Sequence, residues 1–146
     1  MTKTEKAKIL FENNYNCAQA IIGAFSEEIG LSAETALKIA NGFGGGVRCG
    51  ELCGAASGAI MVIGMKCGFH IQNDLDQKNF CNKKTAEFLD LFKKENGSIL
   101  CRDILGTDIR TPEDHTTDQA KAAHKAVCPA VVARAAALLE TFDVDK

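Results

Sequence analysis

The sequence has little proline, few alternating apolar stretches and no closely spaced pair of cysteines. Its 146 residues include only two prolines, and runs in which β-branched residues alternate with polar ones are almost absent. This composition argues against a β-rich fold. We therefore expect an all-α fold, a single-domain bundle of about five to seven helices over residues 1–146. The absence of C-x-x-C argues against a thioredoxin-type motif and a zinc ribbon, and without C-x-x-C-H no covalent haem is expected.

Neither an excess charge nor a long apolar run indicates a nucleic acid or a membrane. The formal net charge is −2, so we expect no nucleic acid and no anionic membrane surface as a partner. Residues 1–14 are charged and lack the apolar core of a signal peptide. The apolar run Leu52–Met65 is too short to span a bilayer and is followed by Lys66. We expect a soluble, cytoplasmic protein without a membrane span.

Cysteine is abundant, with seven in the chain. In a reducing cytosol these residues are not expected to form a static disulfide framework, so metal binding, redox chemistry or packing must account for them. The odd number also leaves at least one cysteine outside any set of disulfide pairs.

The stretch 41–68 combines a glycine-rich loop with an apolar helix. Glycines cluster at 42–46, where they permit positive φ angles and close approach to other groups. The helix that follows is expected to begin at Cys53, where the N-terminal N–H groups and the helix dipole favour an anion. Its thiol is therefore expected to lose its proton more easily than a free one. Gly54 and Gly58 lie one turn apart and would let a second helix approach closely.

Three more cysteines are predicted at helix starts. Asn16 has the side chain of an N-cap and predicts a helix over 17–28. A short helix is predicted over 101–105, and Pro129 predicts a new helix beginning at that residue. Other helices are expected over 4–11, 74–96 and about 116–127. Four thiols are thus placed where a thiolate is stabilised: Cys17, Cys53, Cys101 and Cys128.

The other three cysteines receive no shared role. Cys49 could meet Cys53 if the helix begins early. Cys67 shares a helix face with Cys53 but lies about 21 Å along it, too far for the same mononuclear site. For Cys67 and Cys81 a packing role is favoured, since free cysteine is among the most buried residue types.

Histidine and the glycine loop offer weaker candidates. His70 lies three residues after Cys67, and His124 lies four before Cys128, so either pair could ligate zinc. A surface or capping role is favoured for both histidines. The glycine loop could bind a phosphate at the helix start, but it lacks the Gly-Lys-Ser/Thr of a P-loop, and a tight connector between helices is favoured.

The segment Cys53–Gly58 reads CGAASG and resembles the signature of the C_GCAxxG_C_C family, whose name designates redox-active proteins. The resemblance covers nearly the whole chain, with further matching blocks at Asn16–Ala20, at Cys101–Gly106 and at Cys128. It implies that the four family cysteines correspond to Cys17, Cys53, Cys101 and Cys128. The family also resembles part of the split-Soret cytochromes, which implies a redox setting, but this chain lacks their covalent haem motif.

The leading hypothesis is a redox protein whose four family cysteines converge at the ends of packed helices. They would bind an iron–sulfur cluster or another metal, or work as dithiol pairs, with Gly54 and Gly58 allowing a second helix to approach the site. The alternative is a non-catalytic helical binding or accessory protein with buried cysteines. Nucleophilic catalysis by Cys53 is a third hypothesis, although no histidine that could act as its base lies near it in sequence. The redox partner is unknown, and the apolar helix is compatible with a homodimer.

Overall fold

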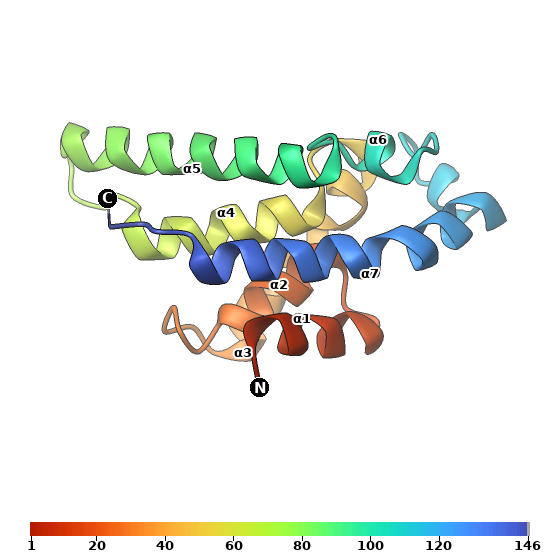
Figure 1. The fold of residues 1–146 in the computed structure, drawn as a ribbon, viewed down its shortest axis with the longest axis horizontal. Coiled ribbons are helices and arrows are strands. Elements are labelled where there is room, and N and C mark those ends of the chain that lie inside the picture. The colour runs from red at the N-terminus through yellow and green to blue at the C-terminus, as the bar shows by residue number, and fades with distance from the viewer. Residues whose placement is uncertain (146) are drawn as a thin grey trace.

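Helix α4 (Gly54–Cys67) lies at the centre of the fold in the computed structural model, which describes residues 1–145. It packs against α2 (Cys17–Phe25) on one side and against α5 (Leu75–Asn96) on the other. Figure 1 shows α4, α5 and α7 (Asp118–Thr141) running along the long axis of the molecule, with α1, α2 and α3 on the opposite side from α5. The remaining elements are α1 (Lys3–Glu12), α3 (Ala33–Ala40), α6 (Cys101–Leu105) and the short helical turns η1 (Asn41–Phe43), η2 (Gly46–Gly50) and η3 (Asp114–Thr116).

The all-α prediction is confirmed. Residues 1–145 form seven α-helices and no strand; their only β-type pairing is an isolated bridge between Leu52 and Leu100. Local signals explain most helix starts: the side chains of Asn16, Ser32 and Asp74 each accept a hydrogen bond from a backbone N–H three residues later. Helix α2 ends at Phe25, earlier than expected, and the chain reaches α3 through a turn.

The prediction of a new helix at Pro129 is wrong. Helix α7 continues through this residue from Asp118 to Thr141, so Cys128 lies in the middle of a helix and not at its start. Proline removes one helical hydrogen bond, to the carbonyl of Lys125. Lys125 and Pro129 are both exposed, so water can form a hydrogen bond with the Lys125 carbonyl instead. Burial of Cys128, Val131 and Val132 on the opposite side then holds the helix together.

Helix α7 has the length and apolar composition that could cross a membrane, and a third of that window is buried inside the fold. The same features occur in core helices of soluble proteins. Here the buried side of α7 contacts α1, α2, α4 and α6, so the fold uses it as a packing helix.

The close approach predicted at the glycines of α4 is present. A Cβ atom on Gly58 would lie 2.7 Å from the backbone oxygen of Ala18 in α2, and one on Gly54 would lie 3.1 Å from the Ala18 nitrogen. The distance at Gly58 is shorter than real Cβ contacts and the distance at Gly54 is tighter than most of them, so α2 and α4 meet backbone to backbone. This contact brings the N-terminal ends of the two helices, and therefore Cys17 and Cys53, to the same part of the molecule.

Candidate functional site

Four cysteines line one cavity of about 250 Å³. One comes from the first residue of α2, one from the N-cap of α4, one from the first residue of α6 and one from the middle of α7. All four are buried, with no more than 7% of each residue exposed. They are Cys17, Cys53, Cys101 and Cys128, the four to which the resemblance in sequence pointed.

Backbone hydrogen bonds hold Cys53 and Cys101 next to each other. The Cys53 N–H donates to the Ile99 carbonyl (2.8 Å), and the Cys101 N–H donates to the Glu51 carbonyl (2.7 Å). These bonds flank the Leu52–Leu100 bridge, so a short antiparallel pairing fixes the starts of α4 and α6 together. On the other side, the capping box of Asn16 and Gln19 fixes the start of α2 and with it Cys17.

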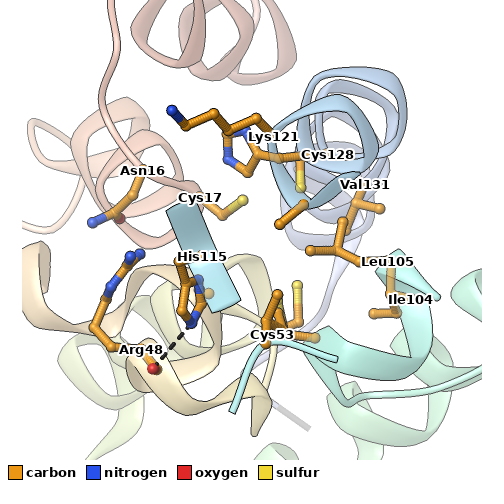
Figure 2. A pocket seen from close by; sticks show the side chains of 16 residues that line it. Asn16, Cys17, Arg48, Cys53, Ile104, Leu105, His115, Lys121, Cys128 and Val131 are labelled. Carbon is orange, nitrogen blue, oxygen red and sulfur yellow. Dashed lines mark hydrogen bonds between the residues drawn. The ribbon is translucent and has the colours of Figure 1, made fainter. Parts of the chain in front are cut away.

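A left-handed turn forms another part of the cavity wall. Four consecutive residues, Gly45 to Arg48, have φ between 57° and 63°. Only glycine fits at position 46, because a Cβ atom there would lie 2.5 Å from the Glu51 nitrogen. The turn places Arg48 at the cavity, and the Arg48 carbonyl is 3.0 Å from Nε2 of His115. Figure 2 shows this hydrogen bond, with the His115 ring beside the cavity.

Val47 occupies the most strained position of this turn. An L-residue with a Cβ in the left-handed region costs roughly 1–2 kcal/mol, and β-branching adds to the crowding. Asn adopts this region more readily, and the Val47 side chain is half exposed. We expect Val47→Asn to raise the free energy of unfolding by about 1 kcal/mol, measured by urea denaturation. A destabilised variant would show that packing of the valine outweighs the strain.

Cys17, His124 and Cys128 form the tightest group of donor atoms, all within 4.8 Å of one another. Figure 2 shows the side chains of Cys17 and Cys128 directed toward each other across the cavity. His124 lies one turn before Cys128 on α7, and its ring packs on Phe11 with 5.2 Å between centroids. Desolvation, then Arg48 and His115, lower the pKa of His124. Its imidazole is therefore neutral at pH 7, the form that binds a metal.

The thiols of Cys17 and Cys128 shift each other's pKa in opposite directions. A hydrogen bond from the Cys17 thiol lowers the pKa of Cys128, and the same bond together with burial raises the pKa of Cys17 well above its ordinary value. As the pH rises, Cys128 is therefore the first thiol of this pair to lose its proton.

Cys53 is not the acidic thiol that its helix-start position predicted. Burial raises the pKa of Cys53 to about 11, although the backbone N–H groups of Ala55 and Ala56 act in the opposite direction. Burial likewise raises the pKa of Cys101 to about 12, and only the Arg48 guanidinium lowers it. Desolvation thus exceeds the opposing effect at both positions, the backbone N–H groups at Cys53 and the Arg48 charge at Cys101. A bound cation would reverse this balance, because coordination deprotonates a thiol.

The other predicted residues are divided between this cavity and the rest of the fold. Gly54 lines the cavity, whereas Gly58 lies one turn further along, against α2. The Cys49 thiol donates to the Gly46 carbonyl at 3.4 Å and is not part of the cavity lining. Cys67 and Cys81 lie in contact with each other elsewhere.

Sequence reasoning missed two polar residues of the cavity, Arg48 and His115, and it favoured a surface or capping role for a third, His124. For His124 a signal existed, since it lies four residues before Cys128 and the two share a helix face. Arg48 and His115 gave no comparable signal, because each reaches the cavity from an irregular segment.

The comparison with family models agrees with this arrangement. Residues 15–142 match the model described as "Putative redox-active protein (C_GCAxxG_C_C)". The chain belongs to this family. The matched range of this C_GCAxxG_C_C protein contains all four cavity cysteines. No curated protein and no solved structure matches the chain.

Proposed function

We propose that this protein is an electron-transfer protein that binds an iron–sulfur cluster through Cys17, Cys53, Cys101 and Cys128. The observation that supports it is the convergence of four buried thiols, from four separate elements, on one cavity. Thiolates are the usual ligands of such clusters. When bound, the cluster would supply one-electron exchange.

The distances between the four cysteine sulfurs favour a cluster over a single metal ion bound by all four cysteines. A tetrahedral zinc site with Zn–S bonds of about 2.3 Å requires its sulfurs to lie roughly 4 Å apart. Only Cys17 and Cys128 belong to the group of donors within 4.8 Å, while Cys53 and Cys101 line the same cavity outside that group.

The surroundings of the cavity suit a negatively charged metal–thiolate centre. Arg48 and Lys121 line it and supply positive charge, and Ile104, Leu105 and Val131 limit the access of water. Hydrogen bonds, burial and nearby charge are the means by which a protein sets the potential of such a centre. The chain's own contribution is therefore to hold four thiolates, offset their charge and exclude solvent.

A second candidate is a mononuclear metal site formed by Cys17, His124 and Cys128. It is favoured by the tight grouping of these three donors and by the neutral state of His124. Three protein ligands would leave one coordination position open, which is the arrangement of catalytic zinc sites.

Anaerobic purification with metal and sulfide analysis tests both candidates. We expect iron and sulfide in stoichiometric amounts and a broad thiolate-to-iron absorbance in the visible region. We also expect His124→Ala to keep the iron and sulfide, because histidine is not a ligand in the first candidate. Colourless protein with one zinc, lost in His124→Ala, would support the mononuclear site and contradict the cluster. Protein without metal after reconstitution with iron and sulfide, and separately with zinc, would contradict both.

A further inference from the structure

Two cysteines outside the four-cysteine cavity contact each other at the other end of α4. Cys67 is the last residue of α4, and Cys81 lies in the second turn of α5. Their sulfur atoms are 3.3 Å apart. About 21 Å of helix separates Cys67 from Cys53, so this pair is independent of the cavity. In Figure 1 it lies toward the connection between α4 and α5, at the opposite end of these helices from α6.

One side-chain hydrogen bond joins α4 to α5 beside the connection, and two more lie within α5 and its N-cap. The Gln77 side chain donates to the Cys67 carbonyl at 2.6 Å, and Asp74 accepts from the Gln77 N–H at 3.2 Å. Thr85 donates to the Cys81 carbonyl at 2.9 Å. The Gln77 bond therefore ties the start of α5 to the end of α4, where the two sulfurs are in contact.

The thiols of Cys67 and Cys81 differ in their exposure to solvent. Cys67 is 6% exposed, whereas Cys81 is partly exposed. Burial raises the pKa of Cys67 to about 11, and the neighbouring Lys84 acts in the opposite direction. Lys84 is itself buried, paired with Glu87 at 3.3 Å, and lies 5.6 Å from the Phe80 ring centroid. An accessible thiol beside an enclosed one, with a buried ammonium nearby, is an arrangement suited to thiol–disulfide exchange.

We propose that Cys67 and Cys81 form a second redox site, which changes between a dithiol and a disulfide by exchange with a low-molecular-weight disulfide. The Cys81 thiolate attacks one sulfur of that disulfide, its S–S bond breaks, and one thiolate leaves. The Cys67 thiolate then attacks the Cys81 sulfur, the mixed disulfide breaks, and the second thiolate leaves. The two cysteines lose two electrons and two protons, and the small disulfide becomes two thiols.

Equilibration with glutathione disulfide and mapping of the cysteines tests this proposal. Trypsin can cleave after Lys66, Lys78 and Lys83, so it releases the two cysteines on separate peptides, 67–78 and 79–83. We expect these peptides to be joined by a disulfide in the oxidised protein and to separate after treatment with dithiothreitol. Joined peptides that do not separate, or Cys81 held as a stable mixed disulfide in the presence of Cys67, would overturn the proposal.

Two variants show whether the order of attack is correct. Cys67→Ala should accumulate the mixed disulfide on Cys81, because the second thiol is absent. Cys81→Ser should form neither the joined peptides nor a mixed disulfide at Cys67, and its partly exposed position makes it the safer variant for folding. Cys49→Ser is the matched control and should behave as the unmodified chain. Oxidation of Cys67 that persists in Cys81→Ser would contradict the assigned roles. Because metal binding is assigned to other cysteines, metal content measured on the same samples tests the proposed function separately.

Discussion

Replacement of Cys128 by serine is expected to lower metal affinity by more than about 100-fold, because removal of an outer hydrogen-bond partner alone costs 10–100-fold. Cys128 is the sulfur whose pKa is lowered, and it belongs both to the four-cysteine set and to the tight group with Cys17 and His124. Its loss therefore removes a ligand in either candidate site. The measurement is metal content after anaerobic reconstitution, normalised to protein and compared with the unmodified chain.

Cys49→Ser is the matched control for this prediction. Cys49 is also a cysteine of the same chain, but its thiol bonds to the Gly46 carbonyl outside the cavity. The Cys49→Ser variant should therefore keep full metal content. Circular dichroism of Cys128→Ser should show retained helix, because serine is smaller than cysteine and fits the same space. Equal metal content in the two variants would contradict the assignment of the cavity cysteines as ligands.

Substitution of Gly58 by alanine is expected to lower the free energy of unfolding by about 1–3 kcal/mol, the usual cost of forcing extra volume into a packed interior. The new Cβ would lie 2.7 Å from the Ala18 oxygen and 3.0 Å from the Ile21 side chain. Backbone atoms cannot turn away as a side chain can, so α2 must shift relative to α4. Chemical denaturation monitored by circular dichroism measures this effect.

Gly64→Ala is the control on the same helix. Gly64 is exposed, and a Cβ there would meet nothing within 4 Å. Alanine favours a helix over glycine, so this variant should be more stable by about 0.5–1 kcal/mol. If both alanine variants were stabilised, the close approach of α2 and α4 at Gly58 would be refuted. Because α2 carries Cys17, Gly58→Ala should also reduce metal content.

The helices were predictable because their signals are local. Asn16 and Asp74 cap the helices that follow them, and the apolar residues recur with the helical period. The same holds for the glycines of α4, whose spacing predicts a close helix contact without naming the partner. Pro129 misled the prediction because its helix-breaking tendency is also local, whereas burial of Cys128, Val131 and Val132 keeps α7 continuous.

By itself the sequence determined the all-α class and the family, since these depend on residue types and their order. It also singled out the four cysteines that line one cavity. Tertiary structure decided which groups meet. It placed His124 with Cys17 and Cys128, and it brought Cys67 to Cys81 across the α4–α5 connection. It also decided acidity: the helix start at Cys53 favours a thiolate, but burial by neighbours distant in sequence raises its pKa to about 11. Desolvation depends on what surrounds a group in space, which only the folded chain determines.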